Sequence, residues 1–129
     1  MYEIRVEHEF AAAHALSISG AREPVHGHNW RVTLTIVGAQ LDDDGLLADF
    51  HTIEHALRET CAPFHNANLN DTPPFDRVNP TAELVAKHIA DALADQLDDA
   101  LAPHARVESV TVTEAPRCRA TYTRPGNPE

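Results

Sequence analysis

The residues best suited to chemistry in this chain are three histidines near its N-terminus. His14 stands alone, while His26 and His28 flank a glycine at the start of the run HGHNWRVTLTIV, which ends at residue 37. Side chains alternate between the faces of a strand, so His26 and His28 point the same way as Trp30 and every second residue after it. Three neutral imidazole nitrogens around one open position form the ligand set of a catalytic zinc. The pattern therefore predicts a metal site.

The preceding segment, from Tyr2 to His14, has the same two-residue period. One face of it carries His14 together with an apolar row of Tyr2, Ile4, Val6, Phe10 and Ala12. Imidazoles aimed at an apolar surface are costly to bury unless something binds them. The alternative is a set of hydrogen-bonded core histidines, because nine histidines in 129 residues also produce chance clusters. The third histidine, in phase on the preceding strand, favours the metal.

Composition indicates one globular domain, expected over residues 1–124, with a frayed tail over 125–129. Hydrophobic residues make up 43% of the chain and charged residues 23%, which is ordinary for a globular protein. No apolar run approaches the roughly 20 residues of a membrane span, and the N-terminus lacks the apolar stretch of a signal peptide. We therefore expect a cytoplasmic protein without membrane association.

Charge and cysteine content exclude further classes. The formal net charge of −10 argues against nucleic acid as a partner, and it means that an anionic substrate needs local cations. Cys61 and Cys118 do not make a disulfide framework, which fits a reducing compartment. Neither has an activating signature nearby, so we expect both to be buried small hydrophobic residues.

The hydrophobic period gives the order of elements. Strands are expected over residues 2–10 and 28–37, a loop over 15–25, a turn over 41–45 and a short strand over 46–47. A helix follows, with Phe50, Ile53, Ala56, Leu57 and Cys61 on its buried side, capped by Asp49 and ended by Pro63. After a loop over 64–79, a second helix is expected to begin at Asn79-Pro80 and to run to about Pro103, with Leu84 to Leu97 in its buried stripe.

Two strands, over 106–114 and about 118–123, close the chain and complete a β-β-(β)-α-α-β-β order. Strands and helices are segregated, which predicts an α+β fold with an antiparallel sheet and both helices on one face. The other face of such a sheet meets solvent, a ligand or another subunit. Its free strand edges also favour pairing between chains.

Two glutamates are candidates for the site. Glu114 ends an apolar row with Val110 and Val112, where it could hold a ligand with two adjacent N–H donors, such as a pterin ring, or simply reach solvent. Glu23 precedes His26 by three residues and could act as a general acid or base, with a solvated loop residue as the alternative. His51 and His55 have a spacing that suits a metal, but no carboxylate motif accompanies them, and we interpret them as surface residues.

These motifs together resemble the family of 6-pyruvoyltetrahydropterin and 6-carboxytetrahydropterin synthases. The resemblance covers nearly the whole chain in order and rests on the sequences FAAAH (10–14), HGH (26–28), DF (49–50), NPTAE (79–83) and TE (113–114). It implies the tunnelling fold, in which β-β-α-α-β-β subunits form a barrel as trimers that commonly stack into hexamers. It also implies zinc bound by His14, His26 and His28, with Thr113 and Glu114 at the pterin and 7,8-dihydroneopterin triphosphate as the substrate.

The sequence departs from the family pattern at two places. Where relatives carry a reactive Cys four residues before the histidine pair, this chain has Arg22, and Glu23 follows. That resembles the variant in which Glu replaces Cys, whose members cleave the substrate side chain to 6-hydroxymethyl-7,8-dihydropterin. The family's Asp-His dyad corresponds here to His65-Asn66. Asn cannot shuttle a proton, so we assign this role to His65, an imidazole that titrates near neutrality.

The sequence thus predicts a zinc-dependent carbon–carbon lyase with Glu23 and His65 as catalytic residues. We rank formation of a 6-hydroxymethyl or 6-carboxy product above 6-pyruvoyl chemistry, and name Arg22, Arg117 and Arg119 as candidates to hold the triphosphate. One rival is a zinc- and pterin-binding paralogue without activity, suggested by Arg22 and Asn66. Another is a cupin-like metal enzyme, disfavoured because no Glu follows His28 closely and two helices are central.

Overall fold

The computed structural model of this chain describes residues 1–126. The long strands are β1 (Tyr2–His14), β4 (His26–Gly38), β6 (Ala105–Ala115) and β7 (Cys118–Thr123), and the helices are α1 (Phe50–Cys61) and α2 (Ala82–Leu101). Shorter pieces complete the described part: β2 (Ser17–Ile18), β3 (Ala21–Arg22), β5 (Ala67–Asn68) and the 3₁₀ turns η1 (Ala62–Phe64) and η2 (Leu69–Asp71). The predicted frayed tail over 125–129 falls mostly outside the described residues, and the single domain over 1–124 stays a prediction.

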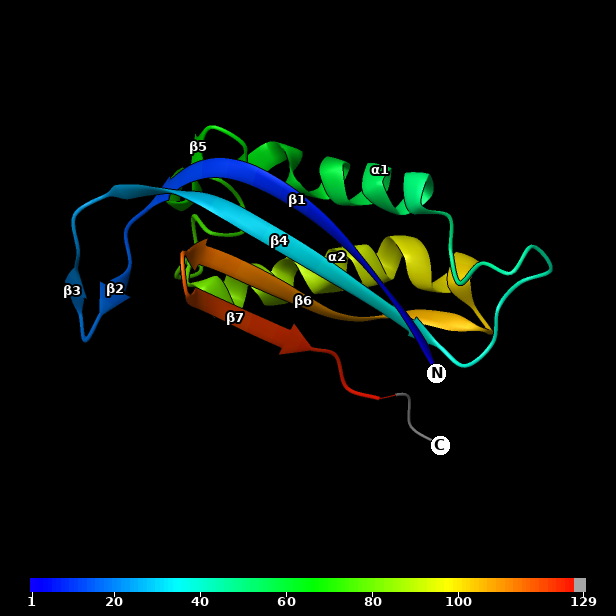
Figure 1. Cartoon of the computed structure of the whole chain (residues 1–129). Coiled ribbons are helices and arrows are strands. Elements are labelled where there is room, and N and C mark those ends of the chain that lie inside the picture. Colours follow the sequence, from blue (N-terminus) through cyan, green and yellow to red (C-terminus); the bar gives the residue numbers. More distant parts are fainter. Residues whose placement is uncertain (127–129) are drawn as a thin grey trace.

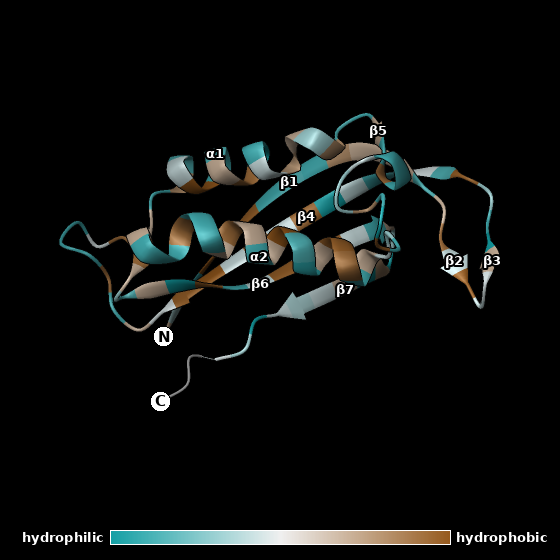
Figure 2. Ribbon diagram, turned by 180° about the vertical axis from the view of Figure 1, so that it is seen from behind, coloured by the Kyte–Doolittle hydropathy of each residue, from teal (hydrophilic) through white to brown (hydrophobic). Residues whose placement is uncertain are grey.

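The main sheet has the strand order β5-β1-β4-β6-β7. The four long strands pair antiparallel, as predicted, but β5 pairs parallel with β1 through Ala12 and Ala13, so the complete sheet is mixed. Both helices lie on one face of this sheet, which is also clear in Figure 1 and, from the helical side, in Figure 2. The α+β architecture with two helices on one face is therefore confirmed.

The hydrophobic core lies between the sheet and the helices. Its sheet side is built by alternate residues of the long strands, including Phe10, Trp30, Val32, Leu34, Val110 and Val112. Its helix side includes Ile53, Leu57, Val85, Ile89 and Leu93. Two residues expected in the buried helical stripes are instead at the surface, because each lies in the first turn of its helix: Phe50 is 52% exposed and Leu84 is 37% exposed.

The helix starts show which polar residue caps each helix. Asp49 caps α1 as predicted, since its carboxylate accepts a hydrogen bond from His51 N at 3.0 Å. Helix α2 begins later than predicted, because Thr81 rather than Asn79 is its cap and accepts from Leu84 N at 3.1 Å. The side chain of Asn79 is engaged elsewhere, with the backbone of Ser17.

Three further expectations are corrected by the structure. Residues 46–47 form no strand, because Leu46 bonds back to Asp42 through both its N–H and its C=O and closes the turn on itself. The expected loop over 15–25 contains the β2–β3 hairpin, which projects beyond the main sheet (Figure 1) and turns at Gly20 with a φ of 80°. Cys61 is buried as expected, but Cys118 is exposed at the edge of β7.

Candidate metal centre

The three predicted histidines meet at one end of the main sheet. Strand β1 pairs with β4 so that His14 lies opposite His26 and Ala12 lies opposite His28. Because side chains alternate along a strand, all three imidazoles are on the helix-facing side of the sheet. Their ring centroids are 4.7 Å apart for His14 and His26, 5.2 Å for His14 and His28, and 4.8 Å for His26 and His28.

Backbone carbonyls orient two of the rings. His14 is completely buried, and its Nδ1–H donates to the carbonyl of Pro80 at 2.8 Å. His26 is 40% exposed, and its Nδ1–H donates to the carbonyl of Pro24 at 3.0 Å. A carbonyl can only accept, so each ring carries its proton on Nδ1 and offers the lone pair of Nε2. This is the arrangement in which metal-binding histidines are held by the residues behind them.

Glu114 adds a carboxylate to the three imidazoles. Its Oε1 lies 2.8 Å from Nε2 of His14 and 3.6 Å from Nε2 of His28. One ligand atom from each of these four residues lies within 4.8 Å of every other. Nitrogen and carboxylate oxygen donors converging on one point at this spacing fit a divalent metal ion such as zinc.

Unsatisfied nitrogens give an independent indication. Nε2 of His14 and Nε2 of His28 are buried and have no partner in hydrogen-bond geometry among the described residues. Such atoms cost free energy unless a ligand accepts their lone pairs. Burial is the main cause that lowers the pKa of His28, with Glu114 acting in the opposite direction, and a neutral imidazole is the form that binds a metal. The residues present therefore fit a metal at this position.

The aromatic ring of Trp30 packs against the histidine cluster. Trp30 is fully buried, and its indole packs edge-on against His14 and His28 with centroid distances of 4.9 and 5.8 Å. The indole N–H donates to the carbonyl of Ala12 at 3.1 Å, and the other side of the ring stacks on Phe10. Sequence reasoning placed Trp30 on the correct face but did not identify this supporting role, although its phase with His28 was the available signal.

The hairpin places Glu23 beside the cluster. Glu23 N–H donates to the carbonyl of Leu16, and Leu16 N–H donates to Oε1 of Glu23, both at 3.0 Å. That oxygen is 3.7 Å from Nδ1 of His26. The carboxylate is about one-third exposed, so one edge of it remains open to a ligand near the histidines.

His65 lies apart from the histidines. It is exposed at the end of η1, and its electrostatic neighbour is His8, whose pKa is lowered mainly by burial and further by Arg58 and His65. The hollow of about 480 Å³ beside His28 is lined by Asn66 and not by His65. One chain therefore does not bring His65 to the metal cluster, and its catalytic role stays a prediction.

A second hollow, of about 650 Å³, opens beside the cluster on the side of Glu114. It is lined by His28, Thr113 and Glu114 together with Glu9, Gly27, Asn29, Arg31, Ala115 and Pro116. The two residues that the sequence assigned to the pterin, Thr113 and Glu114, thus share one hollow with a predicted metal ligand. Glu114 in addition contacts the histidines, which the sequence alone did not indicate.

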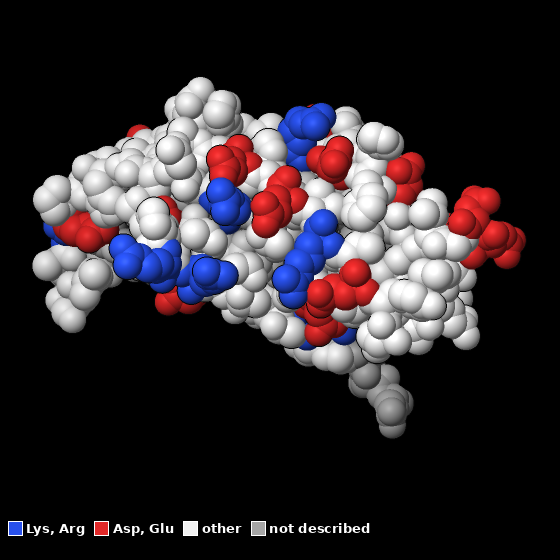
Figure 3. All heavy atoms as spheres, in the orientation of Figure 1, with Lys and Arg blue, Asp and Glu red and all other residues white. Residues whose placement is uncertain are grey.

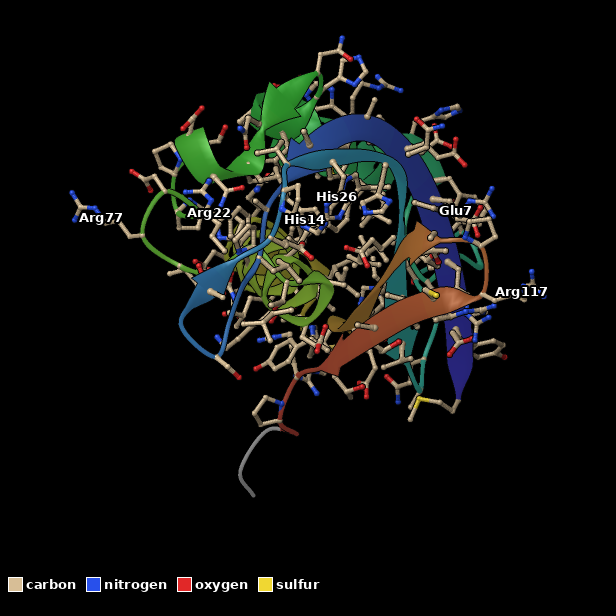
Figure 4. The ribbon with its side chains drawn as sticks, turned by 90° about the vertical axis from the view of Figure 1, so that its left-hand side faces the viewer. Glu7, His14, Arg22, His26, Arg77 and Arg117 are labelled. Carbon is tan, nitrogen blue, oxygen red and sulfur yellow. The ribbon has the colours of Figure 1, made fainter. Side chains whose placement is uncertain are left out.

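The predicted anion-binding arginines, Arg22, Arg117 and Arg119, fall on two sides of the cluster, and the structure adds Arg77, which the sequence did not suggest. Figure 4 shows Arg22 and Arg77 on one side of His14 and His26, and Arg117 on the other side with Glu7. Arg22 and Arg77 line a hollow of about 330 Å³. Arg117 and Arg119 line a hollow of about 610 Å³ on the uncovered sheet face, where positive and negative side chains are interspersed (Figure 3).

Other candidates lie outside the centre. His51 and His55 are both exposed on α1, as expected for surface residues. Burial raises the pKa of the Cys61 thiol to about 12, so this residue is not a nucleophile near neutral pH. Among residues 1–126, neither helix is long and apolar enough to cross a membrane.

Comparison with known proteins places this arrangement in context. A family model described as 6-pyruvoyl tetrahydropterin synthase matches residues 3–125. The 6-carboxy-5,6,7,8-tetrahydropterin synthase of Bacillus subtilis (strain 168) is 34% identical over 103 residues, which cover 75% of this chain and 68% of the relative.

Solved structures show the same fold. The 6-pyruvoyl tetrahydropterin synthase of Caenorhabditis elegans superposes with a TM-score of 0.83 at 19% identity, covering 96% of each chain. A Plasmodium vivax 6-pyruvoyltetrahydropterin synthase, in a variant with a catalytic glutamate replaced by alanine, superposes with a TM-score of 0.75 at 23% identity and covers 95% of this chain and 97% of that one. The tunnelling fold predicted from the sequence is thereby confirmed.

Proposed function

The chain belongs to the 6-pyruvoyl tetrahydropterin synthase family, and we propose that it is a zinc-dependent lyase that cleaves the side chain of 7,8-dihydroneopterin triphosphate. The observation that carries the proposal is the convergence of three imidazoles on one point beside a hollow that also holds Thr113 and Glu114. Two of these imidazoles bond through Nδ1 to backbone carbonyls, which leaves Nε2 as the nitrogen that can bind a metal.

His14, His26 and His28 would hold the metal. When bound, zinc supplies a Lewis acid that polarises the side-chain hydroxyls of the substrate and lowers their pKa. The protein's part is to hold the three rings in the correct orientation. Three features serve that end: the full burial of His14, the hydrogen bonds to the carbonyls of Pro80 and Pro24, and the packing of Trp30 against His14.

Glu114 would hold the pterin ring. A carboxylate accepts two parallel N–H bonds, and the 2-amino-4-oxo edge of a pterin offers two adjacent donors of that geometry. Glu114 is one-quarter exposed and lines the 650 Å³ hollow, so one carboxylate can face both the histidines and a ring bound there. Thr113 lines the same hollow and adds a further polar group.

Glu23 would move the proton that side-chain cleavage requires. Leu16 N–H holds one carboxylate oxygen in place 3.7 Å from Nδ1 of His26, and the Glu23 side chain is about one-third exposed. A general base must come within hydrogen-bond reach of the proton that it abstracts, and this position offers that reach to a hydroxyl held between the histidines. The catalytic glutamate of the Plasmodium vivax enzyme supports a carboxylate in this role within the family. His65 could take part only from another subunit or after a movement of η1.

The triphosphate needs cations on a chain whose net charge is −10. Arg22 is next in sequence to Glu23, and Arg77 lines the same hollow; neither makes an ion pair within residues 1–126. When the pterin is held at Glu114 and the substrate side chain extends past the histidines toward Glu23, the triphosphate at its end comes to Arg22 and Arg77. We therefore favour Arg22 and Arg77 over Arg117, which lies on the opposite side in Figure 4, and over Arg119, which lines the same hollow as Arg117.

A homo-oligomer, trimer or hexamer, is part of the proposal. In the described strands, the outer edge of β7 and most of the outer edge of β1 have no partner strand. Edges of this length favour pairing with another chain. The uncovered sheet face is lined by threonines and interspersed charges, which suits the water-filled interior of a closed ring.

The test is to incubate zinc-loaded protein with 7,8-dihydroneopterin triphosphate and to identify the pterin product by mass. We expect side-chain cleavage, to the 6-carboxy product if the chain shares the chemistry named for the Bacillus subtilis relative, or to the 6-hydroxymethyl product if Glu23 directs a simpler cleavage. Glu23→Gln should keep zinc and lower kcat by about 10²- to 10⁴-fold, the usual contribution of a general acid or base.

A second candidate is a binding paralogue without turnover. It is favoured by one observation: Asn66, which cannot carry a proton, lines the 480 Å³ hollow beside His28 where the family has a histidine. Substrate that stays intact while zinc and pterin both bind would select this candidate over the lyase.

A further inference from the structure

Three consecutive residues that lead from β1 into the first hairpin strand are held through both of their backbone polar groups. Residues 15–17 follow His14 directly, so their path decides how the hairpin leaves the metal cluster. In an extended segment, the N–H and C=O of one residue point to the same side, and those of the next residue point to the opposite side. The partners on the two sides are different, and their identity assigns a role to two asparagines.

On one side, asparagine side chains take the place of a neighbouring strand. Ala15 N–H donates to Oδ1 of Asn70 at 2.8 Å, and Nδ2 of Asn70 donates back to the Ala15 carbonyl at 2.9 Å. Ser17 N–H donates to Oδ1 of Asn79 at 2.9 Å, and Nδ2 of Asn79 donates back to the Ser17 carbonyl at 3.0 Å. Each side chain thus reproduces the paired bonds of an antiparallel ladder.

On the other side, the residue between them binds Glu23. Leu16 donates to the Glu23 carboxylate and accepts from the Glu23 N–H, both at 3.0 Å. The carboxylate is therefore positioned by a peptide group whose two neighbours are fixed by Asn70 and Asn79. A shift of residues 15–17 would carry Glu23 away from the His26 ring, which lies 3.7 Å from its Oε1.

The two asparagines are themselves anchored close to the metal ligands. Asn70 N–H donates to the side chain of Asn68 at 3.0 Å in the η2 turn, which fixes Asn70 in place. Asn79 precedes Pro80, whose carbonyl holds His14. One loop, over residues 68–80, thereby supports both a predicted metal ligand and the predicted acid/base residue.

We infer that Asn70 and Asn79 are positioning residues that fix the Glu23 carboxylate relative to His14 and His26. This inference rests on the proposed function, in which Glu23 moves the proton. Misplacement of a catalytic group by about 1 Å can cost roughly 10²-fold in rate. The asparagine side chains bond to the backbone of residues 15–17, so their effect on Glu23 passes through that backbone and the Leu16–Glu23 bond. Both side chains also line the hollow of Arg22 and Arg77.

The test is a double-mutant cycle between Asn79→Ala and Glu23→Ala in the zinc-loaded protein. We expect Asn79→Ala to lower kcat by about 10- to 100-fold while zinc affinity changes less than about threefold. In the Glu23→Ala background, Asn79→Ala should lower kcat no further, because residues that act through one another are not additive. Asn79→Asp, which keeps the acceptor for Ser17 N–H and loses the donor, should fall between Ala and wild type.

A second readout does not depend on activity. Amide hydrogen exchange at Leu16 and Ser17 should become at least about tenfold faster in Asn79→Ala, because Ser17 N–H loses its acceptor and the segment that holds Leu16 N–H on Glu23 is no longer fixed. The control is Gln96→Ala, which removes an amide side chain that also makes a tertiary bond, to Thr60 on α1 at 2.9 Å, far from the site. It should leave both kcat and this exchange unchanged.

The possible outcomes distinguish a failure of the proposed role of Glu23 from a failure of the positioning role of the asparagines. If Glu23→Ala keeps the wild-type kcat, the proposed role of Glu23 fails and the positioning role fails with it. If Glu23→Ala is impaired but Asn79→Ala is not, or if the two effects add, the proposed function stands and the inference on the asparagines is wrong. Unchanged exchange at Leu16 and Ser17 in Asn79→Ala would also overturn it.

Discussion

Replacing His26 with alanine should remove most of the metal-dependent stabilisation with little change in the metal-free fold. His26 is the most exposed of the three predicted ligands, with 40% of its side chain accessible. Within residues 1–126, the single hydrogen bond of its side chain is to the carbonyl of Pro24. A surface substitution of this kind changes the free energy of unfolding by about 0.5 kcal/mol or less. His14→Ala lacks this advantage, because His14 is fully buried and bonded to Pro80.

The magnitude follows from linkage between binding and folding. At a free zinc concentration of 100 times Kd, binding stabilises the native state by about 2.7 kcal/mol. For 129 residues the unfolding entropy is about 0.27 kcal/mol/K, so zinc should raise the Tm of the wild type by about 10 °C. Loss of a ligand should weaken binding at least as much as loss of a group behind it, up to about 100-fold, which leaves a rise of about 1–2 °C.

The assay is thermal unfolding by circular dichroism with excess chelator and at the fixed zinc concentration, with bound zinc measured by atomic emission. The matched control is His55→Ala, which removes an exposed histidine on α1 outside the cluster and should keep the full rise. A wild-type Tm that does not depend on zinc, or an equal rise in His26→Ala, would refute the assignment of the metal to these histidines.

Two other predictions concern acid stability and the triphosphate. Burial lowers the pKa of His88 below its usual value of 6.5, so the unfolded chain binds the extra proton more readily and stability should decline as pH falls below about 6.5; His88→Phe should weaken this decline in urea titrations at pH 5 and 7. The pair Arg22→Ala with Arg77→Ala should raise KM for the triphosphate substrate by about tenfold or more, and leave KM for unphosphorylated 7,8-dihydroneopterin unchanged. Arg117→Ala with Arg119→Ala is the matched control, and a larger rise in KM from that pair would place the triphosphate on the uncovered sheet face.

Much of the fold was predictable because its signals are local. The two-residue period gave β4 and β6 to within about two residues, and the change to a helical period gave α1 with its Asp49 cap. The start of α2 was misplaced because the best local capping residue, Asn79, is used in a tertiary contact. The strand predicted over residues 46–47 was wrong for a related reason, since the adjacent turn satisfies the backbone hydrogen-bonding groups of Leu46.

The sequence by itself determined which side chains share one face of a strand. Alternation along a strand fixes that His26 and His28 share one face, and that Glu114 continues the row of Val110 and Val112, whatever the rest of the chain does. The metal-binding residue types could therefore be recognised in the sequence before the pairing of the strands was known.

Only the tertiary structure decided how those groups are held together. The strand register that sets His14 opposite His26, the Pro80 carbonyl 66 residues away that fixes the His14 ring, and the asparagines that fix residues 15–17 all join distant parts of the chain. Such contacts leave no periodic trace in a sequence, because a single carbonyl or amide satisfies each of them. The sequence therefore showed which residues could form the centre, and packing decided their protonated nitrogens, their spacing and the position of Glu23.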